Sequence, residues 1–360
     1  MLAGFAGLLF LWLGIAQVNK PQHILRDGDN GPATKAEVND PHALAVDGSI
    51  LYIAENTNTV RRLDLRTGVI TTLQTQSKLE PIASLAVDTA GNLIVAEFTA
   101  ERVRRVDPRA GTVTTVAGSG GTGFSGDGGP AINATLRRPE GVTTDRDGNI
   151  YFADIANYRI RRVDARTGTI TTVAGNGNNN SDGDRGSALK AGLELPNSVA
   201  VDHDGNIFVA QYGYGQHSHR IRRIDGRTGI ITTVAGMGRA GLSGDRGPAF
   251  SAGLQSPSDL LFDRTGNLYV VDPVNDRVRL IDANTKTIIT VAGSTKGFGG
   301  DGGPASRARL NNPSSIALDA DGNLYIAEFV NHRVRRVDAR TGIIETIAGN
   351  GLPSHGHTMR

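Results

Sequence analysis

Short apolar runs alternate with polar turn segments along most of this chain. In one representative stretch, four runs rich in Val, Ile, Thr and Tyr lie at 141–145, 150–153, 159–164 and 169–174. These residue types favour β-strands. The segments between the first two and the last two runs are Asp-Arg-Asp-Gly-Asn (145–149) and Asp-Ala-Arg-Thr-Gly (164–168). Because Gly and Asn accept positive φ, both segments predict tight hairpin turns.

This four-strand pattern occurs six times, in copies that start at Pro41, near Pro81, and at Pro139, Pro196, Pro257 and Pro313. Repeats of about 40–60 residues with four strands each are typical of a β-propeller. We therefore predict an all-β fold, a six-bladed β-propeller over residues 41–350 with four antiparallel strands per blade. Every copy keeps its own last strand, so no blade has to borrow one.

Two segments carry a resemblance to a known family. After Tyr-x-Ala-Asp/Glu, the chain reads Asn-Tyr-Arg-Ile at 157–160 and Asn-His-Arg-Val at 331–334, which resembles the NHL repeat. The match extends over residues 27–351 and is similar to extracytoplasmic bacterial NHL proteins, with blades ending in Thr-Thr-Val-Ala-Gly. The resemblance implies a six-bladed propeller. The second copy departs from it, with Ala100 and Glu101 in place of Asn-His.

Composition narrows the function classes. The chain has 360 residues and no cysteine, which excludes disulfides, a thiolate metal site and a cysteine nucleophile. Its 38 basic and 36 acidic residues give a formal charge of +2, so nothing drives it generally towards nucleic acid. We predict no nucleic-acid partner, and a monomer.

The N-terminal residues differ from the repeats. Residues 2–16 are uncharged and apolar, too short for a typical spanning helix, and end in Gly14-Ile15-Ala16. We predict a signal peptide or an N-terminal anchor at 1–16, then a lead-in with a capping loop at 17–40, and a C-terminal tail at 351–360. The protein is then extracytoplasmic, either periplasmic or secreted, and it contacts a membrane only if the first segment stays uncleaved.

The hairpin order separates two faces of the ring. The tight turns lie on one face, and the strand two-to-three connections and all long loops are expected on the other. Function is usually carried by such loops. We predict a ligand-binding face there, formed by Phe98, Tyr212, Tyr214, His217, His219 and Phe329 together with the strand-entry residues His42, Glu140 and Asn197.

Carboxylates recur at the ends of the second strands. We place them in an acidic ring at the mouth of the central channel, comprising Glu55, Glu97, Asp154, Asp272 and Glu328, with Gln211 in the remaining blade. Two interpretations stay open. Each carboxylate caps a loop or meets an arginine, or the ring binds a cation or polar ligand.

Three other recurring features have structural explanations. Gly-Asp-Gly-Gly-Pro-Ala loops, as at 126–131, predict a turn that leads into a short helical cap, rather than a phosphate cradle or calcium loop. The Asp-x-Asp-Gly-Asn turns resemble the start of an EF-hand but lack its distant Glu. Arginine pairs such as Arg161-Arg162 point to opposite faces of a strand, which favours Arg–Asp pairing within and between blades.

The insertion in the fourth copy brings a His-x-His pair, His217 and His219, which binds a metal only if a third ligand, such as His42 or His332, reaches it. No cofactor is required, and a divalent metal stays open. The first functional hypothesis is a non-enzymatic binding or scaffold module for a protein, peptide or glycan ligand. The alternative is a metal-dependent lyase, resembling peptidyl-hydroxyglycine or streptogramin lyases.

Overall fold

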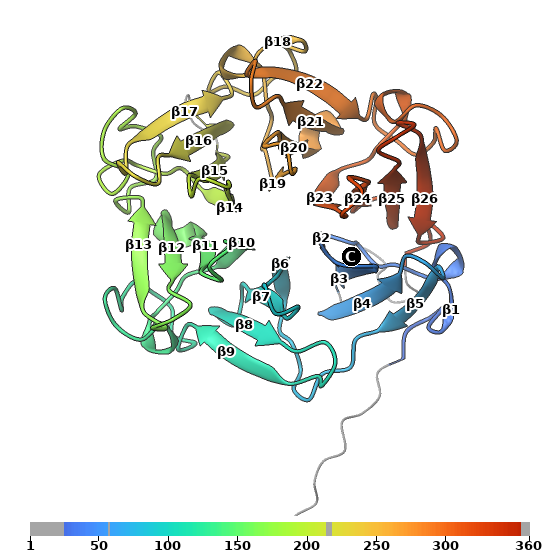
Figure 1. The fold of residues 1–360 in the computed structure, drawn as a ribbon, viewed down its shortest axis with the longest axis horizontal. Helices are drawn as coiled ribbons and strands as arrows, with labels where there is room; N and C mark the ends of the chain where they lie inside the picture. Colours follow the sequence, from blue (N-terminus) through green and yellow to red (C-terminus); the bar gives the residue numbers. More distant parts are fainter. Residues whose placement is uncertain (1–24, 57, 214–217, 354–360) are drawn as a thin grey trace, which may run out of the picture.

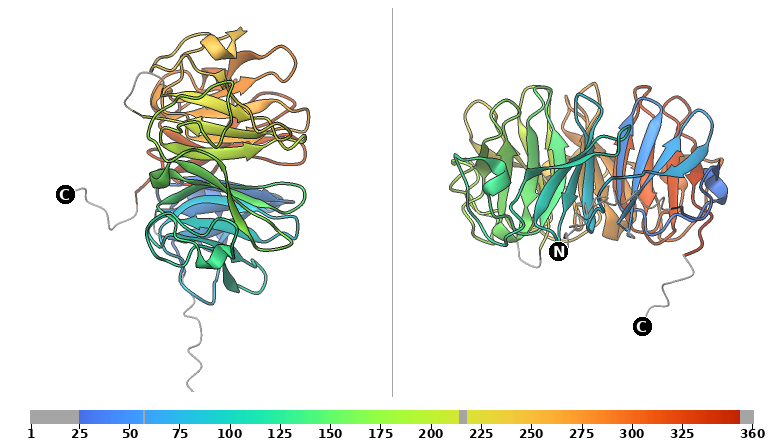
Figure 2. Two further views of the ribbon diagram at one scale, coloured as in Figure 1. Left: turned by 90° about the vertical axis from the view of Figure 1, so that its left-hand side faces the viewer. Right: turned by 90° about the horizontal axis from the view of Figure 1, so that it is seen from below.

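The computed structural model describes residues 25–56, 58–213 and 218–353, which form a ring of six antiparallel sheets around a central channel (Figure 1). In side view the ring is a thick disc (Figure 2). The predicted all-β, six-bladed propeller is confirmed, with four consecutive strands in every blade. The only helices within the described residues are 3-10 turns of three residues.

The strands run outward from the channel in sequence order within each blade (Figure 1). The innermost strands are β2 (Ala43–Asp47), β6 (Ile82–Val87), β10 (Pro139–Thr144), β14 (Pro196–Val201), β19 (Asp259–Phe262) and β23 (Pro313–Leu318). The second strands are β3 (Ile50–Glu55), β7 (Leu93–Glu97), β11 (Ile150–Asp154), β15 (Ile207–Gln211), β20 (Leu268–Asp272) and β24 (Leu324–Glu328).

The outer half of each blade completes the sheet. The third strands are β4 (Thr59–Asp64), β8 (Arg102–Val106), β12 (Arg159–Val163), β16 (Arg220–Ile224), β21 (Arg277–Ile281) and β25 (Arg333–Val337). The outermost strands are β5 (Val69–Thr72), β9 (Val113–Ala117), β13 (Ile170–Ala174), β17 (Ile231–Ala235), β22 (Thr287–Ala292) and β26 (Ile344–Ala348).

Aspartates hold the tight turns together. Asp145 Oδ1 accepts hydrogen bonds from the backbone N–H groups of Asp147 and Asn149 at 3.0 and 2.9 Å, and Gly148 has a φ of +80°. In the next turn, Asp164 Oδ1 accepts from the N–H of Thr167 at 2.9 Å. These carboxylates are engaged by their own turns, which confirms the structural interpretation of the Asp-x-Asp-Gly-Asn segments.

The long loops do not stay on one face, and this part of our expectation is wrong. After β9, the loop runs down the outer edge of the next blade, where Gly128 N–H donates to the Ile170 carbonyl and Ala131 N–H to the Gly168 carbonyl, both at 2.9 Å. Gly168 belongs to a tight turn, so these capping loops reach the opposite face.

In the loop before blade four, residues 188–190 form a turn, whereas the other four capping loops make a 3-10 turn at the blade junction, which confirms the predicted short cap there. These turns are η1 (Ala33–Lys35), η2 (Ala131–Asn133), η4 (Ala249–Ser251) and η6 (Ala305–Arg307). Two loops also add a two-residue fifth strand to a blade, β1 (Gly31–Pro32) beside β5 and β18 (Gly247–Pro248) beside β22. The remaining turns, η3 (Ile155–Asn157) and η5 (Pro273–Asn275), connect second and third strands.

The Arg–Asp pairing predicted within blades is confirmed. The Arg161 side chain is fully buried and joins Asp127 of the capping loop at 2.9 Å to Asp154 at the end of β11 at 3.1 Å. Equivalent buried arginines lie in four other blades, namely Arg61, Arg222, Arg279 and Arg335. In blade two the connection at 73–81 has no 3-10 turn, and Arg104 is 14% exposed and pairs with Glu97 at 3.4 Å.

The seam between the last and first blades closes as the other capped junctions do. Gly349 N–H donates to the Ala33 carbonyl and Asn350 N–H to the Ala36 carbonyl, both at 3.0 Å. The equivalent two bonds elsewhere in the ring run from Gly118 N–H to the Ala131 carbonyl at 3.0 Å and from Ser119 N–H to the Ala134 carbonyl at 2.8 Å. One apolar cluster includes side chains from both ends of the propeller, which ties the ring together.

Candidate functional site

The innermost strands begin around a polar cavity of about 170 Å³ at one end of the channel. Each blade contributes one entry residue, and we call these six residues the mouth ring: His42, Ala83, Glu140, Asn197, Ser258 and Ser314. Three of our predicted site residues, His42, Glu140 and Asn197, therefore come together at this cavity.

Half of the mouth ring is engaged in holding neighbouring blades together. Ser314 Oγ donates to the Pro41 carbonyl at 2.9 Å, and Ser258 Oγ donates to the Ser314 carbonyl at 3.3 Å. His42 has its Nε2 2.9 Å from the Ile82 carbonyl and its Nδ1 3.1 Å from the Asp40 carbonyl. Burial lowers the pKa of His42, so its imidazole is neutral at pH 7 and donates to one carbonyl.

Two of the remaining residues keep free hydrogen-bonding capacity, whereas the third, Ala83, has an apolar side chain. The Oδ1 of Asn197 is buried and has no hydrogen-bond partner within the described residues. Glu140 meets Arg138 Nη2 at 3.2 Å, and burial raises the pKa of its carboxyl. Blades three and four therefore present acceptors to whatever enters the mouth, because a buried unpaired acceptor gains free energy from a donor.

A second layer of residues follows the mouth ring, one position further along each innermost strand. Five of its residues are small, and the sixth is Asp259 of blade five: Ala43, Ser84, Gly141, Ser198, Asp259 and Ser315. Asp259 accepts from Ser315 Oγ at 2.8 Å and from Ile316 N–H at 3.0 Å, and burial raises its pKa to about 6. We did not predict Asp259, although it is the one charged residue at this register of the repeat.

The five acidic residues of the predicted ring do not line this cavity, so their placement at the channel mouth is wrong. Each is at most 1% exposed and accepts hydrogen bonds inside its blade: Glu55, Glu97, Asp154, Asp272 and Glu328. Asp154, for example, accepts from the N–H of Arg137 at 2.7 Å as well as from Arg161. The capping interpretation holds, and burial raises the pKa of Asp154 to about 6.

The structure describes three of the aromatic residues of the predicted binding face. Phe98, Tyr212 and Phe329 follow the second strands and are half-buried. Tyr214 and His217 lie outside the described residues.

The Nδ1 of His219 is not available to bind a metal, because it accepts a hydrogen bond from the N–H of Ser256 at 3.0 Å. His219 is 9% exposed and has a φ of +57°. In other blades Asp276 and His332 take the same place, with acceptors 2.9 Å from Asn312 N and 3.4 Å from Asp40 N. The position therefore links consecutive blades, and no group of three or more metal-binding side chains occurs in the described parts of the chain.

A larger cavity than the one at the channel mouth lies where we expected no function, among the tight turns. A groove of about 770 Å³ separates blades four and five, and three phenylalanines line it: Phe208, Phe250 and Phe262. Phe208 and Phe262 pack edge-to-face with ring centroids 4.8 Å apart. A comparison of the six copies in register would have found this groove, because Phe262 replaces smaller residues such as Val46 and Leu318.

Comparison with known proteins places the chain among NHL propellers. The Teneurin NHL domain family matches residues 119–182 and 295–358. Teneurin-4 of Mus musculus is 32% identical over 243 residues, which cover 61% of this chain and 8% of that protein. NHL repeat-containing protein 2 of Bos taurus is 26% identical over 338 residues, which cover 87% of this chain and 40% of that protein. The chain thus spans less than half of either relative.

A solved structure of similar fold is an auxiliary nutrient binding protein from Bacteroides thetaiotaomicron, with a TM-score of 0.62 and 16% identity over 87% of this chain and 70% of that one. With the observed blades, these matches identify the chain as an NHL-repeat β-propeller protein. Within the described ranges, no helix has the length and apolar character to cross a membrane.

Proposed function

We propose that this chain is a non-enzymatic, extracytoplasmic binding or scaffold module. Its loop-rich face, by which we mean the face with the mouth ring and the connections between second and third strands, binds a protein, peptide or glycan ligand. The observation that carries the proposal is the divided mouth ring. Three of its residues hold blades together, whereas the Asn197 Oδ1 lacks a partner among the described residues and Glu140 meets only one arginine. A ligand that inserts an N–H or O–H donor at the mouth would satisfy them.

The aromatic residues around the second-strand ends would supply apolar contact. Phe98, Tyr212 and Phe329 are half-buried on this face, and Tyr214 and His217 belong to the same proposed surface by sequence. Partly exposed aromatics are enriched at binding surfaces. The extracytoplasmic location rests on the apolar segment at 2–16, whether it is cleaved or retained as an anchor. We expect the protein to be a monomer.

The lyase alternative needs several histidines or other metal ligands at the channel. The mouth ring supplies one histidine, and both of its nitrogens lie against backbone carbonyls. The free acceptors at the mouth favour recognition of a donor instead.

The test is a screen of the full chain against immobilised glycans and peptides. For any hit, Glu140→Gln combined with Asn197→Leu should weaken binding by about tenfold or more, the cost of losing roughly one hydrogen bond to a charged group. The pair Tyr212→Ala and Tyr214→Ala should also weaken it. The control variants Arg166→Glu and Arg340→Glu, in tight turns, should leave it unchanged. Zinc at unit stoichiometry in the purified protein, or control variants that abolish binding, would reverse the assignment.

A further inference from the structure

The groove between blades four and five, which we call the aromatic groove, collects exceptions to the repeat. Phe208 stands where four other blades have tyrosine, at 52, 151, 269 and 325. Phe262 stands where the others have Val, Thr or Leu, and Phe250 is the one aromatic residue at its place in the capping turns. All three line the same cavity, and Phe208 and Phe262 are in edge-to-face contact within it.

 

Blade five adds two changes in the same place. Lys286 occupies the last position of the second tight turn, where the other five blades have glycine, and it keeps their backbone conformation with a φ of +58°. A lysine rarely adopts this conformation, so the turn tolerates strain at this position. In the first tight turn, Thr265 replaces the exposed aspartate found at 147, 204 and 321. Both residues line the aromatic groove.

These changes give the groove an apolar floor and a cationic wall. Arg264 and Lys286 are exposed on the blade five side. The aspartates that begin the same two turns are engaged by those turns: Asp263 Oδ1 accepts from the N–H of Thr265 at 2.9 Å, and Asp282 Oδ1 accepts from the N–H of Thr285 at 2.7 Å. Asp204 lies on the opposite wall, in blade four. Arg223 also lines the blade four wall, where it pairs with Asp225 at 3.1 Å, whereas Arg264 and Lys286 form no ion pair within the described residues. The cations without an ion pair therefore lie on the blade five side of the groove.

The groove is also open. Phe250 is 64% exposed, which is costly in water for a side chain of this size. A small molecule in an enclosed pocket would not leave such a ring uncovered, whereas a partner surface laid over the groove would cover it.

We infer that the aromatic groove is a second binding site, on the face opposite the channel mouth, for a peptide segment of a partner protein that carries an aromatic or branched apolar side chain beside acidic residues. The apolar side chain enters among Phe208, Phe250 and Phe262, and the carboxylates lie towards Arg264 and Lys286. This site is separate from the proposed loop-face site, so either can fail without the other.

The probe is the tetrapeptide acetyl-Asp-Trp-Asp-Leu-amide, titrated by calorimetry into the full chain, with acetyl-Lys-Trp-Lys-Leu-amide as its charge-reversed counterpart. We expect the acidic peptide to bind at least about tenfold more tightly than the basic one, because two attractive charge interactions with Arg264 and Lys286 become repulsive in the basic peptide. Indole-3-acetate serves as a small-molecule probe and should bind more weakly than the acidic peptide.

The variants use residues that the repeat itself already carries, so that folding is preserved. Phe250→Ser takes the residue found at 306 and should weaken the acidic peptide about tenfold. Lys286→Gly takes the residue of the other five blades and should weaken binding while raising the melting temperature. Ile132→Ser is the matched control, because Ile132 is 54% exposed at the same place in another capping turn.

The inference would be overturned if the acidic peptide does not bind the unmodified protein, or if both tetrapeptides bind with equal affinity. It would also be overturned if Ile132→Ser weakens binding of the acidic peptide as much as Phe250→Ser does, or if indole-3-acetate binds as tightly as the acidic peptide.

Discussion

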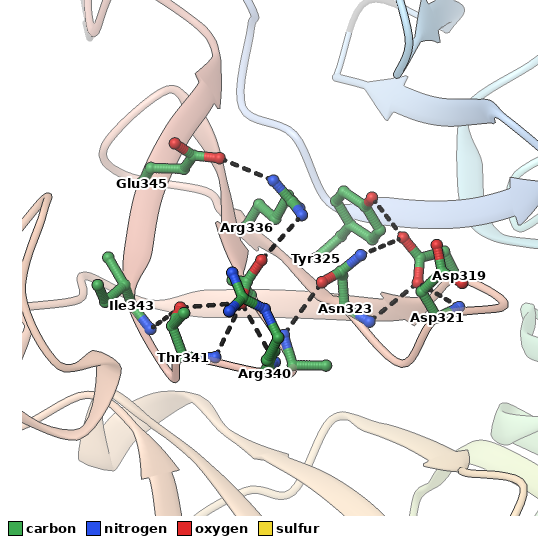
Figure 3. Close-up of polar contacts among 11 residues, drawn as sticks. Asp319, Asp321, Asn323, Tyr325, Arg336, Arg340, Thr341, Ile343 and Glu345 are labelled. Carbon is green, nitrogen blue, oxygen red and sulfur yellow. Dashed lines mark hydrogen bonds and ion pairs between the residues drawn. The ribbon is translucent and has the colours of Figure 1, made fainter.

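The junction between blades six and one and the junction between blades four and five have the same backbone but different side chains. In the first, polar contacts of blade six (Figure 3) border a groove of about 490 Å³. The Tyr325 hydroxyl donates to Asp319 at 2.8 Å, and Arg336 meets Glu345 at 3.0 Å. In the second, Phe208 and Thr232 stand at the positions of Tyr325 and Glu345, and the groove is about 770 Å³.

The difference separates what the fold requires from what it permits. Both junctions keep the 3-10 cap, the Asp-held turns and a buried arginine, which together fix the backbone. The side chains that line the grooves are not needed for that purpose, so they are free to differ. In a repeat protein, departures that gather on one surface are therefore better pointers to binding than residues shared by every copy.

The shared arginines should show the largest effect. Arg335→Ala leaves Glu328, which is fully buried, without its cation and should cost about 3–5 kcal/mol of unfolding free energy. Arg279→Ala should cost a similar amount, because both arginines are fully buried. Denaturant melts measure both. Arg104→Ala in the uncapped blade is the comparison and should cost less than half as much, since Arg104 is 14% exposed; an equal loss would show that the capping loops add nothing.

Asp259 distinguishes blade five from blade six within the channel, where blade six has Ser315. Burial raises the pKa of Asp259 to about 6, so the folded state binds this proton more tightly than the unfolded state does. Its contribution to stability is therefore greatest below about pH 4 and is lost as the pH rises through about 6, by at most about 3 kcal/mol.

Asp259→Ser should remove this dependence. The difference in unfolding free energy between the variant and the unmodified protein, measured by denaturant melts from pH 4 to pH 7, should shift in favour of the variant as the pH rises. A difference that stays constant over this range would show that Asp259 does not titrate there.

A reciprocal exchange tests the second tight turn. Gly342→Lys puts a side chain at a φ of +68° and should destabilise by about 1 kcal/mol, although no atom lies within 4 Å of its new Cβ. Lys286→Gly should stabilise by a similar amount or slightly less, because glycine is also more flexible in the unfolded chain. Thermal melts of the two variants should therefore shift in opposite directions. Shifts in the same direction would mean that Lys286 is not strained.

The smallest effect is expected from Phe208→Tyr. The new hydroxyl can donate to Asp202 as Tyr325 does to Asp319, which should add about 0.5–1 kcal/mol of stability. The same hydroxyl makes the floor of the aromatic groove more polar and should weaken the acidic peptide. A stability gain with unchanged peptide affinity would remove Phe208 from the proposed site.

The sequence was sufficient for the strands, turns and blade count because each copy contains its own complete set of local signals. The strand runs predicted at 150–153 and 169–174 agree with β11 and β13 to within one residue. The grouping of His42, Glu140 and Asn197 could also be predicted, because each directly follows the proline that starts its copy and therefore lies at an equivalent place around one axis.

Other features could not be predicted, because they depend on which segments, far apart in the sequence, lie together in the fold. The capping loops run along the neighbouring blade, so their path depends on contacts such as Ala131 with Gly168 that no local pattern reveals. The carboxylate of Glu328 turns into its blade because Arg335 and a backbone N–H are there. The aromatic groove combines Phe208, Phe250 and Phe262 from three separate segments, and only the ring geometry brings them together.

The most direct test of the account is to ask which phenylalanines respond to the acidic tetrapeptide. The ten phenylalanines can be labelled with 4-fluorophenylalanine and assigned by single substitution, and their ¹⁹F resonances followed during the titration. We predict shifts at Phe208, Phe250 and Phe262 and none at Phe98 or Phe329. Shifts confined to Phe98 and Phe329 would place the peptide on the loop-rich face and contradict the claim that the exceptions to the repeat mark a binding groove.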